Sequence, residues 1–173
     1  MQLKIFIKSI FFFLLGGLFL TSCQKEEVVD EPRTLEQEMS ELGAWIQNLE
    51  NKGEDVDTTD MGVFYILQET GEGEFPQEGD TCYVEYSAYL PSGKRFYTTE
   101  DFYNQGIRVF PYKNPQDMIE GLENGIGHLN KGAKAEMIIP SPLAYGSQGT
   151  NEVPPYTTVI FVVKMHDLVP VLD

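Results

Sequence analysis

Residues that could perform covalent or metal chemistry are few in this chain and stand apart from one another. His128 and His166 have no second metal ligand at a suitable spacing, and Cys23 and Cys82 form no Cys-x-x-Cys pair. No serine lies in a Gly-x-Ser-x-Gly elbow, and no glycine-rich loop extends to a dinucleotide or Walker A pattern. The sequence therefore predicts no metal and no cofactor.

The net charge excludes one class of partner. Among 173 residues, acidic side chains outnumber basic ones 27 to 12, which gives a formal net charge of −15. Without residues 1–22, which contain two lysines, 27 acidic and 10 basic residues would give −17. Nucleic-acid phosphates repel such a chain, and an anionic lipid surface attracts it little. Nucleic acid is therefore not expected as a partner.

The first 22 residues have the arrangement of an export signal. Two lysines precede the uncharged run 10–20, which as a helix would cover about 16 Å and is too short to span a bilayer core. Leu20-Thr21-Ser22-Cys23 then resembles the lipobox of bacterial lipoproteins, in which the cysteine becomes the lipidated first residue. The resemblance implies that residues 1–22 are a lipoprotein signal peptide and that Cys23 is the lipidation site. An ordinary signal whose cleavage site contains a cysteine is the alternative.

The segment after the cysteine is charged, contains a proline and has no apolar period. Residues 23–33 are therefore predicted to form a flexible tether whose lipid at Cys23 binds the membrane. This implies a location in the bacterial cell envelope, at the outer membrane, with the periplasmic and the surface face both open.

Residues 34–52 are predicted to form an amphipathic helix. Thr34 and Gln37 match a capping box, and Gly53 provides a stop. Apolar residues recur at intervals of three and four, at Leu35, Met39, Leu42, Trp45, Ile46 and Leu49. This stripe could pack on the following domain, contact a client, or form a homodimer through residues 34–51, which sedimentation with and without residues 23–52 would decide. The polar residues 53–61 are expected to be a linker.

From residue 62 onward, apolar residues alternate with a period of two. Five runs with the aromatic and β-branched content of strands follow one another, at 63–68, 81–90, 94–98, 133–139 and 157–165. One short helix is expected among them, capped by Asn114 with Pro115 at its first position. Its expected buried face is Met118, Ile119, Leu122, Ile126 and Leu129. The predicted fold class is α+β, an antiparallel sheet folded over this helix.

Several short motifs occur in one order between residues 63 and 168. They are Gly79-Asp80-Thr81, Val84-Glu85-Tyr86, Ser92-Gly93-Lys94-Arg95-Phe96, Met118-Ile119-Glu120-Gly121-Leu122-Glu123, Ala144-Tyr145-Gly146, Val153-Pro154-Pro155 and Val159-Ile160-Phe161. Their order and spacing resemble the FKBP-type peptidyl-prolyl cis-trans isomerases. The resemblance implies an FKBP-like fold over residues 62–173, in which a curved antiparallel sheet wraps one short helix and leaves an aromatic-lined hollow.

The resemblance implies an enzyme that accelerates rotation about X–Pro bonds in exported or envelope proteins. Its partners would be proline-containing unfolded or partly folded polypeptides, and it would need no cofactor. Peptide-bond rotation faces a barrier of about 18–20 kcal/mol. A pocket poor in water disfavours the charge-separated planar amide more than the twisted one, so no nucleophile or metal is required.

Matched motif by motif, the resemblance assigns nine residues to the substrate site: Tyr86, Phe96, Tyr97, Met118, Ile119, Leu122, Tyr145, Val153 and Phe161. Tyr86, Phe96 and Phe161 would form walls, although the tyrosine and Phe161 could instead be ordinary core residues. The Ile119 backbone N–H and the Tyr145 hydroxyl would bind substrate carbonyls. Met118 and Val153 would line the rim.

The sequence departs from the family pattern at four places. Tyr97 stands where the family usually has an acidic residue, which predicts reduced activity, and it could instead be an exposed strand residue. Leu122 replaces a tryptophan at the pocket floor, and Thr150 or its neighbour replaces a common histidine. Residues 100–112 are about three residues longer than usual, which leaves the match of that stretch to the pocket open.

Two other functions stay open beside the isomerase. A non-catalytic FKBP-like chaperone or adhesion module would bind chains without turnover. A surface lipoprotein that captures a glycan or another nutrient is the third possibility. Turnover of a proline peptide separates the first two functions, and specific retention of a glycan would favour the third.

Overall fold

The computed structural model describes residues 33–114 and 118–171. The predicted signal peptide, the lipidation site Cys23 and all of the predicted tether except Arg33 lie outside these residues. Within the described ranges, no helix combines the length and the apolar character that a membrane span requires.

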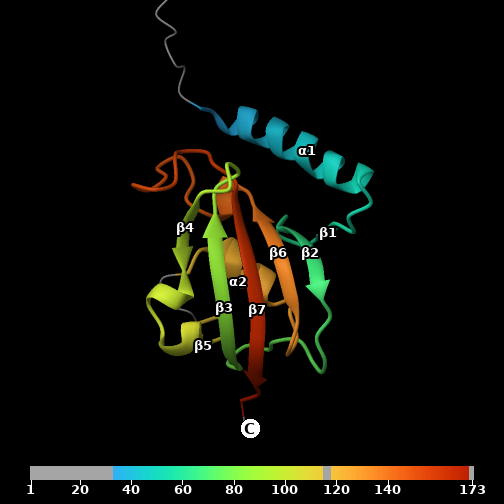
Figure 1. The fold of residues 1–173 in the computed structure, drawn as a ribbon, viewed down its shortest axis with the longest axis vertical. Helices are drawn as coiled ribbons and strands as arrows, with labels where there is room; N and C mark the ends of the chain where they lie inside the picture. Colours follow the sequence, from blue (N-terminus) through green and yellow to red (C-terminus); the bar gives the residue numbers. More distant parts are fainter. Residues whose placement is uncertain (1–32, 115–117, 172–173) are drawn as a thin grey trace, which may run out of the picture. The chain divides into compact units, whose positions relative to one another are not determined.

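The described strands form one sheet in which every paired neighbour is antiparallel (Figure 1). In chain order they are β1 (Asp57–Thr58), β2 (Phe64–Glu69), β3 (Thr81–Tyr89), β4 (Arg95–Thr98), β5 (Arg108–Pro111), β6 (Lys134–Ile139) and β7 (Val159–Val169). The order across the sheet is β1-β2-β6-β7-β3-β4, and β5 also pairs with β3. The predicted α+β class is confirmed.

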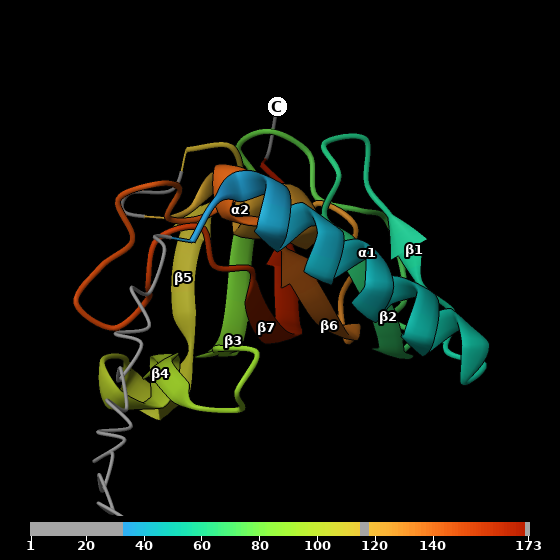
Figure 2. The ribbon, with the colours of Figure 1, turned by 90° about the horizontal axis from the view of Figure 1, so that it is seen from above.

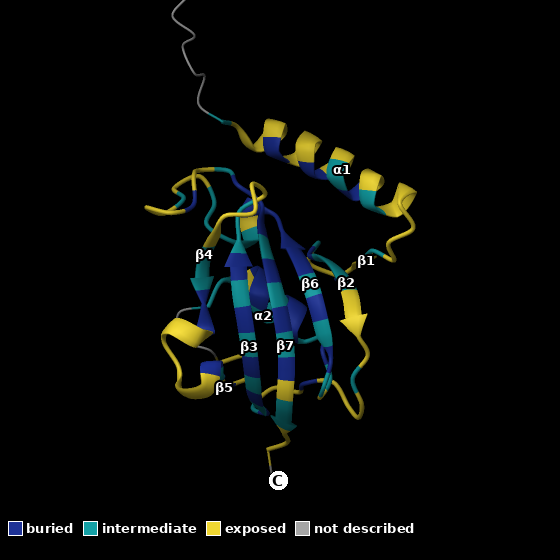
Figure 3. Cartoon of the chain, in the orientation of Figure 1, coloured by how far each residue is buried: buried dark blue, intermediate teal, exposed yellow. Residues whose placement is uncertain are grey.

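The two longest strands, β3 and β7, pair near the centre of the sheet and contribute many of the buried core residues. Their register sets Tyr86 opposite Val163 and Ala88 opposite Phe161, so that these side chains lie on one face. Along both strands, buried residues alternate with more exposed ones, as the banding in Figure 3 shows. This is the alternation of a sheet with one covered face, and the period of two in the sequence predicted it.

Helix α2 (Glu120–Ile126) covers that face through Leu122 and Ile126, which are buried. The predicted start of this helix at Asn114 and Pro115 is wrong, because Ile119 is its N-cap and has an extended backbone, with φ −69° and ψ 144°. The carbonyl of Ile119 accepts the amides of Leu122 and Glu123. The helix therefore begins late, and Met118 and Ile119, which precede it, line a cavity.

Helix α1 (Leu35–Asn51) begins with the predicted capping box of Thr34 and Gln37 and ends before Gly53, whose φ is +88°. It belongs to the same compact unit as the sheet and lies across one end of it, over the ends of β6 and β2 (Figures 1 and 2). Leu42 and Ile46 are buried there against Ile138. Of the three alternatives for the apolar stripe, packing on its own domain is therefore what the structure has, while pairing with a second copy stays a prediction.

The buried face of α1 differs from the predicted stripe at its first turn. Leu35 and Met39 are 41% and 44% exposed, whereas Glu38 is 1% exposed. The face that packs on the domain thus runs from Glu38 through Leu42 and Ile46. Counting only apolar residues rotated the predicted face by about one residue at this end.

Two short strands lie where no strand was expected. Strand β1, inside the predicted linker 53–61, pairs with the start of β2, and the buried Thr59 accepts the amide of Val63. Strand β5 returns to β3 after the long stretch that follows β4, so that both occupy the same edge of β3 at different heights. The pairing of β5 with β3 brings Arg108 within hydrogen-bond distance of Tyr86.

Candidate functional site

A cavity of about 270 Å³ opens between the inner face of the sheet and the start of α2. Its size is just below the about 300–1,000 Å³ that is usual for small-molecule pockets, which suits one side chain of a bound polypeptide. It is lined by Tyr86, Tyr97, Arg108, Met118, Ile119, Leu122, Tyr145 and Phe161. The walls are thus mainly aromatic and aliphatic, with a few polar groups at defined positions.

The aromatic rings of the site pack against one another. Tyr86 stacks on Tyr97 with ring centroids 5.5 Å apart and lies 5.8 Å from Phe161 at a tilt of 49°. Phe96 meets Phe161 and Tyr145 edge to face, at 6.4 and 6.0 Å. Offset and edge-to-face pairs at these distances are favourable beyond the area that they bury. The rings therefore form a connected wall.

Tyr86 is fixed at both its backbone and its hydroxyl. Its amide donates to the Thr99 Oγ1 at 3.1 Å, and that hydroxyl donates back to the Tyr86 carbonyl at 3.3 Å. The Arg108 Nη1 donates to the Tyr86 hydroxyl oxygen at 2.9 Å. Because Thr99 and Arg108 lie on either side of the stretch between β4 and β5, that stretch orients the tyrosine at the pocket wall.

Sequence analysis missed Arg108, which lines the cavity and is buried. Its guanidinium also lies over the rings of Tyr103 and Phe110, 5.9 and 5.7 Å from their centroids. Such cation–π contacts stabilise a partly desolvated guanidinium. Arg108 and Phe110 are two residues apart, as residues on one face of a strand are, so the sequence contained an indication of β5. The unusual length of the segment 100–112 prevented its recognition.

Tyr145 enters the cavity from a short turn after β6. The 3₁₀ turn Ser141–Leu143 follows Pro140, and the amides of Ala144 and Gly146 both donate to the Ser141 carbonyl, at 2.9 and 2.8 Å. Burial, followed by the nearby Tyr86 and Glu152, raises the pKa of the Tyr145 hydroxyl. The pKa of Tyr97 is also raised, first by burial and then by Tyr86 and Tyr103. Both phenols therefore stay protonated at neutral pH and can donate.

Seven of the nine residues assigned to the site from the sequence line this one cavity: Tyr86, Tyr97, Met118, Ile119, Leu122, Tyr145 and Phe161. The other two do not line it. Phe96 packs against the rings of Tyr145 and Phe161. Val153 is 1% exposed and belongs to the core, and its amide donates to Thr150 Oγ1 at 3.0 Å. The roles of these residues toward a substrate stay predictions.

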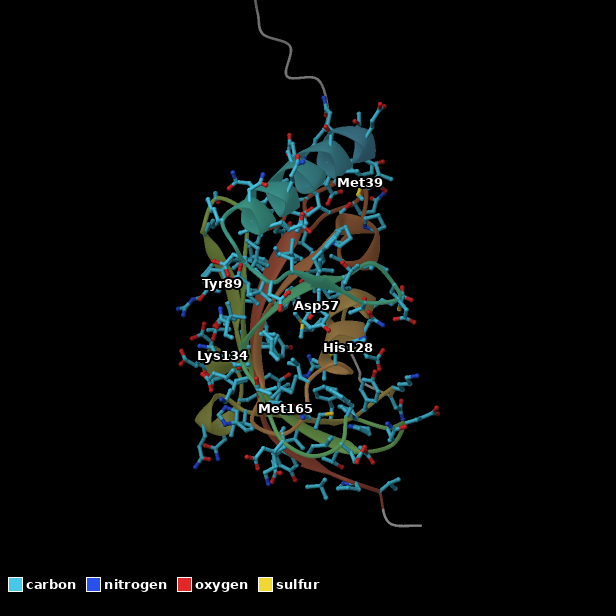
Figure 4. The ribbon with its side chains drawn as sticks, turned by 90° about the vertical axis from the view of Figure 1, so that its right-hand side faces the viewer. Met39, Asp57, Tyr89, His128, Lys134 and Met165 are labelled. Atoms are coloured by element: carbon cyan, nitrogen blue, oxygen red, sulfur yellow. The ribbon has the colours of Figure 1, made fainter. Side chains whose placement is uncertain are left out.

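The other candidates for chemistry lie elsewhere. His128, labelled in Figure 4, follows α2 with its ring 5.6 Å from that of Tyr65, and His166 pairs with Glu85 at 2.9 Å. Cys82 is buried in β3, where burial and then Asp80 raise the pKa of its thiol to about 12, so it is not a nucleophile at neutral pH. Among the described residues, no three His, Cys, Asp or Glu side chains are placed to hold a metal ion.

Comparison with known proteins identifies the family. A family model of the FKBP-type peptidyl-prolyl cis-trans isomerases matches residues 72–166. The chain belongs to the FKBP-type peptidyl-prolyl cis-trans isomerase family. It is 35% identical over 120 residues to the isomerase FkpA of Escherichia coli, which covers 69% of this chain and 42% of FkpA. A probable FKBP-type isomerase of Haemophilus influenzae is 35% identical over 121 residues, with 69% and 48% covered.

Solved FKBP-type structures agree with this fold. The crystal structure of Escherichia coli FkpA superposes with a TM-score of 0.61 at 29% identity, over 79% of this chain and 63% of that one. An isomerase from Pseudomonas syringae pv. tomato superposes with a TM-score of 0.65 at 21% identity, over 81% and 99%. The chain spans about half the length of the curated FKBP relatives that it matches. The predicted FKBP-like fold is confirmed, and α1 lies before the part that the family model matches.

Proposed function

We propose that this FKBP-family chain is a peptidyl-prolyl cis-trans isomerase that accelerates X–Pro rotation in exported or envelope polypeptides. The observation that carries the proposal is the cavity itself, whose apolar walls from Tyr86, Leu122 and Phe161 suit a proline ring. Leu122, at the predicted floor, is buried and continuous with the core. The family resemblance and the curated relatives named as such isomerases support the same activity.

The proposed mechanism is differential binding. Planarity of the X–Pro bond depends on a charge-separated resonance form, which a pocket poor in water stabilises less than bulk water does. The twisted amide lacks that charge separation and loses less on entering the pocket. An acceleration of 10⁵-fold would need about 7 kcal/mol of such differential stabilisation. Protonated Tyr145 would hold a substrate carbonyl while the bond turns.

Replacing Tyr145 by phenylalanine tests the proposal with little change in shape. In a protease-coupled assay on a proline peptide, we expect the unaltered chain to accelerate isomerisation and Tyr145→Phe to lower kcat/KM about tenfold, the upper end of what one hydrogen bond contributes. Tyr89→Phe, on β3 outside the cavity lining, is the matched control and should keep full activity. A silent unaltered chain that still binds unfolded polypeptide would instead favour the non-catalytic chaperone.

We also propose that lipid on Cys23 attaches the mature chain to the membrane. The support is the sequence alone, in which a basic start, an apolar run and Leu20-Thr21-Ser22-Cys23 follow one another. We expect the chain made in a bacterium to sediment with membranes and to incorporate labelled palmitate. Cys23→Ser should abolish the label and release the chain to the supernatant, whereas Cys82→Ser should change neither. Unlabelled, soluble protein before any substitution would refute the anchor.

A further inference from the structure

A buried acidic side chain on α1 is bonded to the domain at three points. Glu38 Oε1 accepts the Ser141 amide and the Thr158 hydroxyl, each at 2.8 Å, and Oε2 accepts the Ser141 hydroxyl. The side chain is in the first turn of the helix, where a negative charge is favourable. Burying a carboxylate is costly unless it is hydrogen-bonded, so these three donors are what permit Glu38 to be 1% exposed.

Ser141 connects this carboxylate to the site. Its amide and hydroxyl bind Glu38, while its carbonyl accepts the amides of Ala144 and Gly146, which flank Tyr145. Every backbone and side-chain polar group of Ser141 is thus used. Hydrogen bonds to Glu38 therefore fix the turn that places the Tyr145 ring in the cavity.

The same carboxylate also reaches the far end of the Tyr145 loop. Thr158 immediately precedes β7, which carries Phe161 to the cavity wall. Glu38 Oε1 accepts one bond from each end of the loop, from Ser141 and from Thr158. Arg33, which precedes the N-cap of α1, donates from its Nε to the Tyr156 carbonyl at 2.7 Å and so contacts the same loop.

We propose that Glu38 is a positioning residue for the isomerase site: by tying together the two ends of the loop 141–158, it holds Tyr145 in its working geometry. The proposal rests on the isomerase function proposed above. It gives α1, which lies outside the part matched by the family model, a direct part in shaping the cavity.

Glu38→Gln is the sharpest test, because glutamine keeps the size and removes one acceptor oxygen. Its –NH2 group can replace the contact of Oε2 only if the Ser141 hydroxyl turns to accept, and a neutral amide forms weaker hydrogen bonds than the carboxylate does. We expect kcat/KM to fall about tenfold, since a misplacement of about 1 Å can cost up to a hundredfold. Glu36→Gln, exposed in the same turn of α1, is the matched control and should leave kcat/KM unchanged.

A double-mutant cycle shows whether Glu38 acts through the loop of Tyr145. If it does, Glu38→Gln will lower kcat/KM much less in a Tyr145→Phe background than in the unaltered chain, because the interaction that it positions is already gone. A general loss of stability would instead reduce kcat/KM by the same factor in both backgrounds. Equal factors in the two backgrounds would overturn the proposal.

Amide hydrogen exchange tests the same link without any turnover. In Glu38→Gln, we expect faster exchange at Ala144 and Gly146 and unchanged exchange at the centre of β3. Trp45, the one tryptophan of the sequence, packs beside the contact of α1 with Ile138, so its fluorescence reports whether α1 stays docked. If docking is lost, Ser141→Ala removes one donor only and should give a smaller increase in exchange at the same two amides.

The exchange result separates two kinds of failure. Faster exchange in the loop together with a chain that has no turnover would refute the isomerase while leaving the contact of Glu38 with the loop established. Unchanged exchange in both Glu38→Gln and Ser141→Ala would refute the positioning role, whatever the activity.

Discussion

Phe161→Ala is expected to lower kcat/KM about a hundredfold, a loss of about 2.7 kcal/mol of transition-state stabilisation. Phe161 lines the cavity and is in ring contact with both Tyr86 and Phe96. Its removal admits water to the cavity and leaves Tyr86 and Phe96 without this ring contact. The proposed catalysis depends on a pocket that excludes water. The measurement is the protease-coupled isomerase assay.

The same change is expected to reduce the free energy of unfolding by about 3–5 kcal/mol, as for other buried phenylalanines. Phe161→Leu therefore serves as the companion variant, because it keeps most of the apolar volume at a cost below about 1.5 kcal/mol. We expect it to lose activity less than tenfold. A folded Phe161→Ala protein with unaltered kcat/KM would show that the cavity is not where the substrate binds.

Gly121→Ala is expected to destabilise the fold by about 2–3 kcal/mol. A Cβ at this position would lie 2.3 Å from Ile139 Cγ2 and 3.0 Å from the Leu143 carbonyl oxygen. Ile139 is fully buried in β6, and the Leu143 atom is backbone, so neither can move aside cheaply. Helix α2 would have to shift away from the sheet. Urea denaturation should show a midpoint about 1 M lower.

Gly43→Ala is the matched control for that change. Gly43 is also helical, on the exposed side of α1, and a Cβ there would meet nothing within 4 Å. Alanine restricts the unfolded chain and favours the helix, so we expect a gain of about 0.5–1 kcal/mol. If Gly121→Ala lowers the free energy of unfolding and Gly43→Ala raises it, the difference arises from the packing of Gly121 against β6. A similar small gain at Gly121 would contradict the close approach of α2 to the sheet.

The alternation of β3 and β7 was predictable because burial on one face of a sheet repeats every second residue. That pattern correctly gave the strands that carry Tyr86 and Phe161, and the capping box correctly gave the start of α1. The start of α2 was wrong for a physical reason. Met118 and Ile119, expected on the buried face of the helix, precede it and line the cavity, and Ile119 has an extended backbone. The spacing of apolar residues cannot distinguish this arrangement from a helical face.

The partners of two buried polar residues could not be predicted from the sequence. Glu38 is not part of the apolar stripe predicted for residues 34–52, and only the donors of Ser141 and Thr158, far along the chain, make its burial favourable. Arg108 reaches Tyr86 because β5 returns to the edge of β3 after a long excursion. The partners of both residues are distant in sequence, so local patterns of charged and apolar residues do not predict these contacts.

The position of β7 between β3 and β6 has a consequence for how the protein is made. It is the last strand described, yet it fills the middle of the sheet, so the earlier strands stay in two unjoined groups until it pairs with both. Pairing of segments so distant in sequence is slow, and the unpaired strand edges are prone to aggregation meanwhile. A chain that ends before residue 159 is therefore expected to expose unpaired strand edges and to aggregate.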